Sequence, residues 1–127
     1  MYFKVYDGDN DITDVYPWVI SSTGEIQYVD YYGPVSMKSL KAMRGLKAVL
    51  YFDDEHSKVI VNELRRCNMN FKVFDKDGKD ITNNYYWVIT QNGEVRYWNY
   101  GDLTGIEGVK VVIYFDNGHV ETFVSSW

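Results

Sequence analysis

Cysteine is almost absent from this chain of 127 residues, since Cys67 is its only one. A single cysteine excludes a disulfide within the chain and a thiolate cluster around a metal ion, and it favours a reducing compartment. No apolar run is long enough for a membrane-spanning helix, and no charged and apolar leader follows Met1. We therefore expect a soluble, unprocessed, cytoplasmic protein that has no contact with a membrane.

Positive charge is also scarce, because 13 Lys and Arg residues face 18 Asp and Glu residues and leave a net charge of -5. The electrostatic field of such a protein repels phosphate groups and attracts basic surfaces. We expect no direct binding to a nucleic-acid backbone, and we expect a partner protein with a basic surface.

Aromatic residues are abundant, at 17% of the chain with 12 Tyr and 4 Trp. Hydrophobic residues make up 46% and charged residues 24%, which is typical of a folded protein. Two small cores hide fewer aromatic rings than this, so some of the rings are expected at an interface, either between parts of the chain or with a partner.

A repeat organises the sequence. Residues 11–31 and 80–100 align without a gap and are identical at 11 of 21 positions. The similarity extends upstream, from F-K-V-Y-D to F-K-V-F-D, and downstream, from L-Y-F-D to I-Y-F-D. The pattern indicates a tandem duplication of a unit of about 60 residues, near the lower limit for a domain that folds alone. We expect repeat 1 at 1–66 and repeat 2 at 67–127, packed as one compact body.

Period-two alternation and turn-forming residues predict five antiparallel strands in each repeat. In repeat 1 the expected strands are 2–6, 18–21, 25–29, 47–52 and 58–62, and repeat 2 has matching segments. Gly24 and Gly93 occupy the turn of the same hairpin in the two repeats. The spacing of Met37, Leu40 and Met43 predicts one short helix near 36–43 in repeat 1. The expected fold is mainly β, with two such units related by a pseudo-twofold axis.

Three carboxylates, Asp7, Asp9 and Asp11, have the spacing that opens a calcium-binding EF-hand loop. The match then fails, because Ile12 stands where that loop needs glycine and Trp18 stands where it needs glutamate. We interpret the segment as a solvated turn and expect no metal site.

Catalytic candidates are few. Glu25 and Glu94 follow the two hairpin turns, and a hydrolase would need them to meet at the junction of the repeats. His56 and His119 occupy matching turns, and one histidine per repeat is too few for a zinc site unless both turns meet. Cys67 has no catalytic motif around it. We expect no enzymatic activity and no cofactor.

The aromatic residues after the hairpin are the better candidates for binding. Rows of Tyr and Trp stack on sugars or bases and are enriched in protein interfaces, whereas two packed repeats use the same residues in their seam. Both interpretations remain open. The predicted binding residues are Asp30, Tyr31, Tyr97, Trp98 and Tyr100.

These motifs, F-K-V-[FY]-D followed by D-I-T, by W-V-I and by a hairpin with a glycine turn, resemble short uncharacterised proteins of bacteriophages and prophages. The resemblance covers most of each repeat and carries no catalytic residue. It implies a phage origin, and thus the cytoplasm of a bacterial host. Small acidic phage proteins of this kind are similar to inhibitors that occupy host enzymes, including nucleic-acid-cleaving defence systems such as CRISPR.

The sequence therefore favours a non-enzymatic protein that binds a basic partner through aromatic residues and carboxylates, with a phage-encoded inhibitor of a host nucleic-acid-handling protein as the most concrete form. The alternative is a binder of a sugar or nucleotide between aromatic rings at the repeat junction. A hydrolase with duplicated carboxylates is the third. The exposed edge strands of such a fold also allow a homodimer, in which an edge strand of one copy pairs with that of another.

Overall fold

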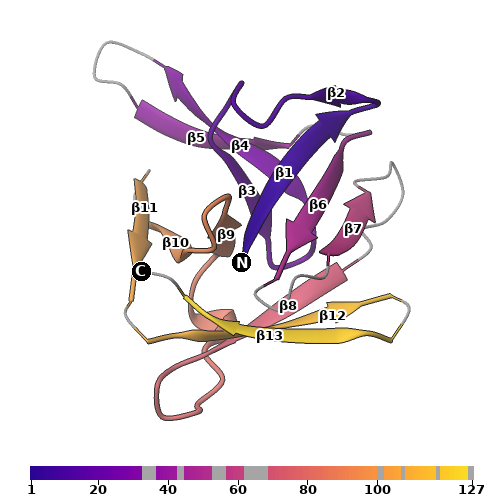
Figure 1. The fold of residues 1–127 in the computed structure, drawn as a ribbon. Coiled ribbons are helices and arrows are strands. Elements are labelled where there is room, and N and C mark those ends of the chain that lie inside the picture. The colour runs from indigo at the N-terminus through magenta and orange to yellow at the C-terminus, as the bar shows by residue number, and fades with distance from the viewer. Residues whose placement is uncertain are drawn as a thin grey trace.

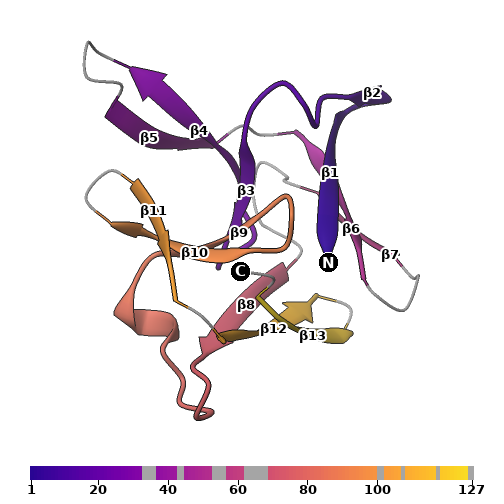
Figure 2. The same ribbon diagram turned by 60° about the vertical axis from the view of Figure 1, so that its left-hand side comes forward.

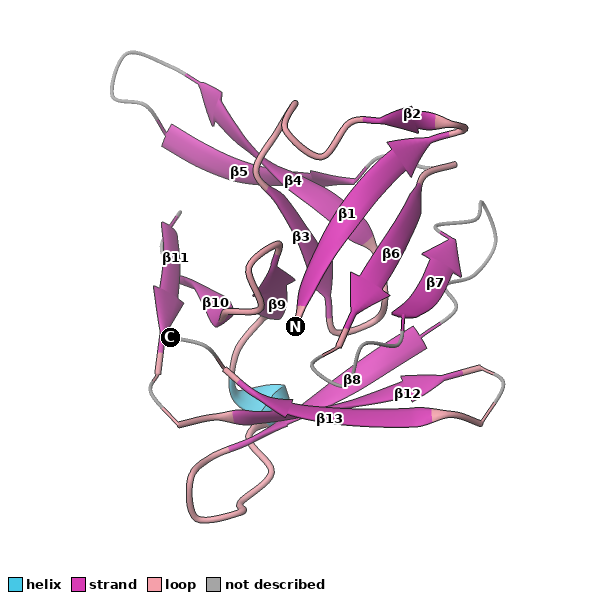
Figure 3. Ribbon diagram, viewed as in Figure 1, coloured by secondary structure: helices cyan, strands magenta, loops and turns pink. Residues whose placement is uncertain are grey.

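The computed structural model of the protein describes residues 1–32, 37–42, 45–52, 57–61, 69–99, 102–106, 108–116 and 118–125. Strands dominate these parts of the chain, with one short 3₁₀ turn, η1 (Figure 3). The elements in chain order are β1 (Tyr2–Asp7), β2 (Asn10–Asp11), β3 (Trp18–Ser21), β4 (Ile26–Tyr32), β5 (Met37–Ala42), β6 (Lys47–Tyr51), β7 (Ser57–Val61), β8 (Met69–Phe74), η1 (Thr82–Asn84), β9 (Trp87–Thr90), β10 (Val95–Asn99), β11 (Asp102–Gly105), β12 (Lys110–Phe115) and β13 (Val120–Val124).

A six-stranded antiparallel sheet in the order β11-β10-β9-β3-β4-β5 forms the centre of the molecule (Figure 1). Its middle strands, β3 and β9, carry the same W-V-I sequence, whose aromatic and β-branched residues suit a buried strand. The two strands pair antiparallel, with Ile20 opposite Ile89, Val19 opposite Thr90 and Ser21 opposite Val88. The register is therefore symmetric about the Ile20–Ile89 pair. The β4–β5 hairpin extends the sheet beyond β3, and the β10–β11 hairpin extends it beyond β9 (Figure 2).

Two smaller antiparallel sheets flank the central one, in the orders β2-β1-β6-β7 and β13-β12-β8. Their registers match between the two halves of the chain, since Phe3 pairs with Leu50 as Phe71 pairs with Ile113. The strands β6 and β12, which are apolar after an initial lysine, are inner strands of their sheets.

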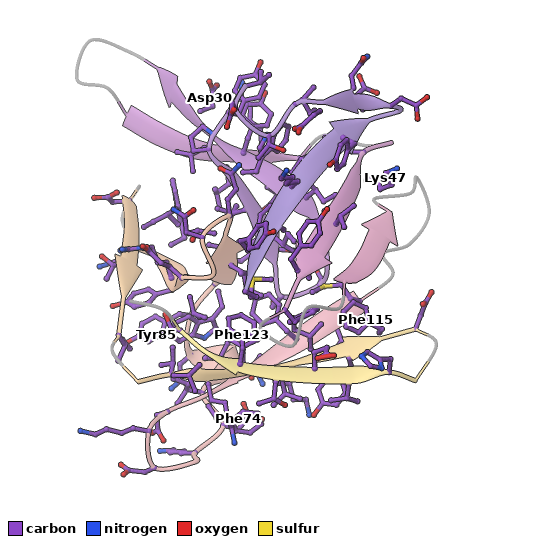
Figure 4. The ribbon with its side chains drawn as sticks, in the orientation of Figure 1. Asp30, Lys47, Phe74, Tyr85, Phe115 and Phe123 are labelled. Atoms are coloured by element: carbon purple, nitrogen blue, oxygen red, sulfur yellow. The ribbon has the colours of Figure 1, made fainter. Side chains whose placement is uncertain are left out.

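The core lies between these three sheets and includes buried residues from both halves of the chain. Trp18, Trp87, Phe3 and Phe71 are among its largest fully buried side chains. Figure 4 shows Phe115 and Phe123 on the side of the β12–β13 ribbon that faces the rest of the molecule, and Phe74 on the opposite side. Each flanking sheet thus has one face against the core, as expected for half-buried antiparallel strands.

The two halves also interlock through their hairpin turns. The Phe3 amide donates to the Gln91 carbonyl at 3.0 Å, and the Phe71 amide donates to the Ser22 carbonyl at 2.9 Å. Each first strand is therefore tied to the hairpin turn of the other half. The backbone is close here, because a Cβ atom built on Gly93 would lie 2.2 Å from the Met1 carbonyl oxygen.

The prediction of a mainly β, antiparallel fold is confirmed, and each predicted strand is present within a residue or a few of its expected bounds. Gly24 and Gly93 both have positive φ, as their hairpin turns require. The tandem duplication as an origin stays a prediction from the sequence, as do the domain bounds 1–66 and 67–127. The junction between them lies outside the described residues.

The predicted helix near 36–43 is wrong. Residues Met37–Ala42 form β5, which pairs with β4 from Gln27–Ala42 to Tyr32–Met37. A helix of this length is unfavourable to nucleate in water, whereas the strand completes a backbone ladder with a neighbour that is already in place. In the second half of the chain β11 occupies the same position beside β10, so the two halves are alike here.

Candidate functional site

The aromatic residues form one three-ring cluster in each half of the chain. Trp18 and Trp87 are buried because they begin the two central strands and face the core. Tyr28 and Tyr97 lie opposite them on β4 and β10 and contact them edge-on, at 5.6 and 5.2 Å between ring centroids. Each tryptophan is held in place by its indole N–H, which donates to the carbonyl of residue 12 or residue 81 at 2.9 or 3.0 Å.

A second tyrosine closes each cluster. Tyr16 stacks on Tyr28 at 4.2 Å, and Tyr85 stacks on Tyr97 at 4.0 Å, with interplanar angles of 22° and 20°. The spaces between these rings are filled by the rings themselves, so neither cluster has a slot for a sugar or a base. Tyr16 and Tyr85 remain partly exposed, at 38% and 46%.

The loop before each cluster is held by the repeated D-I-T sequence. The Asp11 carboxylate accepts hydrogen bonds from the Thr13 backbone amide and hydroxyl, and that hydroxyl oxygen accepts from the Val5 amide at 3.0 Å. The second half repeats these contacts with Asp80, Thr82 and Val73. The threonine hydroxyl and then the backbone amide lower the pKa of Asp11 and of Asp80, because both donate to the ionised carboxylate.

The five predicted binding residues do not share one surface. Tyr97 and Trp98 are consecutive on β10, so their side chains lie on opposite faces of the central sheet. Tyr97 packs in its aromatic cluster, whereas Trp98 is half-buried beside Leu103 on β11. Asp30, on β4, forms an ion pair with Lys41 at 3.0 Å.

Asp30 is also remote from the second aromatic cluster, because Figure 4 shows it at the opposite end of the molecule from Tyr85. The backbone of Tyr31 continues β4, but its side chain is outside the described set, and Tyr100 lies outside the described residues altogether. The role of these five residues in binding stays a prediction.

The duplicated carboxylates Glu25 and Glu94 are not neighbours. They precede β4 and β10, which are separated in the sheet by β3 and β9, a span of about 14 Å at the usual strand spacing. Glu94 forms an ion pair with Arg96 at 2.7 Å, and Glu25 accepts a hydrogen bond from Gln27 at 3.3 Å. The two groups therefore have separate partners and do not form a carboxylate pair.

The remaining chemical candidates are single groups. His119, which precedes β13, contacts Glu121 on that strand at 2.8 Å, while His56 and Cys67 lie outside the described residues. Within the described residues, no group of three His, Cys, Asp or Glu side chains is placed to hold a metal ion. No helix in that part of the chain has the length and apolar character needed to cross a membrane.

One surface was missed by the choice of binding residues. The segment of residues 7–16, called the acidic loop below, contains four aspartates and no lysine or arginine, for a charge of -4. The equivalent residues 75–85 contain three aspartates and two lysines, for a charge of -1. The imbalance is visible in the sequence, but the segment was compared there with a calcium loop and interpreted as a solvated turn, not as a binding surface.

The acidic loop also exposes apolar surface. All four aspartates are exposed, and next to them Val15 and Tyr16 are 59% and 38% exposed. Its backbone is held by the short β1–β2 pairing, by the Ile12 amide donating to the Val5 carbonyl, and by the Val15 amide donating to the Ile12 carbonyl. The acidic loop is therefore a preformed surface that combines negative charge with exposed apolar side chains.

Comparisons with protein-family models, with curated proteins and with solved structures found no match to this chain.

Proposed function

We propose that this protein is a non-enzymatic binding protein that engages a second protein with a basic surface, and that the acidic loop makes the contact. The observation that carries the proposal is the exposed pair Val15 and Tyr16 within a loop of four exposed aspartates. Carboxylates steer a basic partner toward the loop, and the apolar side chains retain it once water is excluded.

The loop is suited to this role because its conformation is already set. Asp11 is engaged by Thr13, so Asp7, Asp9 and Asp14 are the carboxylates available for a partner. Tyr16 is held by its stack on Tyr28 and loses little freedom when a partner covers its outer face. A preordered surface of this kind reduces the entropic cost of association.

Proteins that handle nucleic acid present basic surfaces of the kind that this charge attracts. The proposal therefore extends to an inhibitor that covers such a surface on a host protein, which agrees with the resemblance of the repeats to phage proteins. The partner in this form is a basic protein of the bacterial cytoplasm.

The first test is affinity capture of a bacterial lysate with the tagged protein. Asp9→Asn combined with Asp14→Asn removes two charges and leaves the Asp11–Thr13 contact intact. We expect a captured basic protein to bind this variant at least about tenfold more weakly, and the wild type to lose affinity as salt is raised. Asp77→Asn, in the equivalent loop of the other half, is the control and retains the partner.

Tyr16→Ala tests the apolar part of the surface against a matched control, Tyr85→Ala. Both substitutions remove a ring stacked on a tyrosine and edge-on to a tryptophan, so they destabilise the fold to a similar degree. We expect only Tyr16→Ala to weaken capture. If the folded Tyr16→Ala and Tyr85→Ala variants and the aspartate double variant all capture the partner equally well, the acidic loop is not the contact. A loss of capture with Trp98→Ala alone would place the contact on the face of β10 that carries Trp98 instead.

A further inference from the structure

The strand β13 forms an open edge of the three-stranded sheet. It pairs along one side with β12, and no described strand pairs along its other side (Figure 1). The side chains on its solvent-exposed face are those of Val120, Thr122 and Val124, and Val120 and Val124 are 48% and 61% exposed. Exposed edges of this kind pair readily with another strand unless a charge, a proline or a bulge blocks them.

The hydrogen-bond pattern shows which backbone groups face the open side. The Phe115 amide donates to the His119 carbonyl at 2.9 Å, and the Ser125 amide donates to the Val109 carbonyl at 3.0 Å. In an antiparallel ladder the bonded residues alternate, so 119, 121, 123 and 125 bond to β12. The N–H and C=O groups of Val120, Thr122 and Val124 therefore point away from the sheet.

We propose that a second copy of this chain pairs antiparallel with β13, about a twofold axis at Thr122. Thr122 then lies opposite Thr122 of the second copy. Val120 of each copy lies opposite Val124 of the other copy. The pairing joins β8, β12 and β13 of both copies into one continuous sheet. It uses every outward backbone group of the strand in each copy, and it places exposed valine against exposed valine.

The one charged residue of β13, Glu121, and the extent of the strand select this register. In the proposed pairing Glu121 lies opposite Phe123 of the second copy. A shift of the axis to Glu121 would place the two Glu121 side chains directly opposite each other, which is destabilising. A shift to Phe123 would leave the backbone groups of Val120 without a partner strand among the described residues. The sequence V-E-T-F-V is thus self-complementary about its central threonine.

The contact is small, and each copy carries a net charge of -5. We therefore expect a weak dimer, with a dissociation constant between about 10 μM and 1 mM. Because the two copies repel each other at long range, added salt should tighten the dimer. This salt response is opposite to the one expected for the basic partner, so the two contacts are distinguished by one titration.

The test is sedimentation velocity over a concentration series, with near-UV circular dichroism to confirm folding. Two matched double variants change the same exposed positions. Val120→Lys with Val124→Lys sets like charges opposite each other in the proposed register and should weaken the dimer at least about tenfold. Val120→Lys with Val124→Glu sets opposite charges across both pairs and should keep the dimer at wild-type strength or tighter.

Thr122→Pro gives an independent check, because it removes an outward N–H without removing a bond to β12. The folded variant should sediment as a monomer at all concentrations. A wild-type protein that remains monomeric at about 1 mM overturns the proposal. So does a dimer that persists in folded Thr122→Pro, or one that the Lys/Lys and Lys/Glu variants weaken equally.

Discussion

At the scale of single residues, the Asp-Thr contact is a polar feature that occurs once in each half of the chain. The Asp80 carboxylate is hydrogen-bonded by the Thr82 hydroxyl and amide, which lower its pKa in the folded state below the ordinary value of 3.8. The ionised form is therefore favoured by folding. The resulting stabilisation is fully present above the unfolded pKa and is lost as the pH falls through the lower folded pKa.

We predict that Thr82→Val raises the pKa of Asp80 toward its ordinary value and reduces the part of acid destabilisation that appears below about pH 5. The same substitution leaves the Val73 amide without its 2.9 Å acceptor, which should lower the free energy of unfolding at neutral pH by about 1 to 3 kcal/mol. Urea unfolding at neutral and acidic pH measures both effects. Thr13→Val should behave alike, and stability profiles that stay parallel to the wild type at all pH values would contradict the linkage.

Comparison of the two repeats identifies residues that make the same contacts in both halves. D-I-T and W-V-I are identical in both repeats because they make the same internal contacts twice, in the loop and in the core. The surface that we propose for binding lies where the repeats diverge, as at Val15, which aligns with Asn84. The sequence shows that the two repeats differ at this position. Whether the side chain is exposed to a partner depends on the fold, which the sequence comparison does not give.

At the scale of elements, the turn of the β9–β10 hairpin is packed against the start of the chain. Gly93 has a φ of 81°, and a Cβ atom at this position would lie 2.2 Å from the Met1 carbonyl oxygen. Gly78 has a similar φ of 85°, with open space around it. The two glycines therefore separate backbone strain from steric overlap.

We predict that Gly78→Ala lowers the free energy of unfolding by about 1 to 2 kcal/mol, the usual cost of a side chain in the left-handed region. Gly93→Ala should lower it by clearly more, because the Met1 backbone must also move. Denaturant unfolding of both variants, with the hydrogen exchange of the Phe3 amide as a local readout, measures the difference. Equal losses in the two variants would show that the close approach of Met1 and Gly93 is relieved without cost.

The elements also show where pattern reading succeeds. Period-two alternation and turn-forming residues identified β3, β6, β9 and β12 and the hairpins that follow them, because those signals are local. The strand β5 was misread as a helix, since the spacing of Met37, Leu40 and Met43 fits one face of a short helix. Its conformation depends on pairing with β4, a partner that no local window contains. The split of the predicted site has a simpler origin, because Tyr97 and Trp98 alternate along one strand.

At the scale of the whole molecule, the two halves share both a sheet and a core. Ile20 and Ile89 are fully buried and face each other at the centre of the β3–β9 pair. Hydrogen bonds between the halves also reach the loops, since the Gln91 side chain donates to the Thr13 carbonyl at 2.8 Å and accepts from the Trp18 amide at 3.2 Å. Each half thus completes the surface on which the other packs.

We therefore predict that the protein unfolds in one cooperative transition, although each repeat is close to the size of a small domain. Ile20→Ala, in the first half, should lower the free energy of unfolding by about 2 to 5 kcal/mol. The most protected amides of β6 and of β12, in different halves, should lose the same amount of protection against hydrogen exchange. The exposed substitution Val124→Ala should leave both nearly unchanged. If only the amides of β6 lose protection, the halves open separately, and the shared β3–β9 pair breaks before either flanking sheet. If the amides of β6 and β12 lose the same protection, neither half keeps its fold once that pair is weakened.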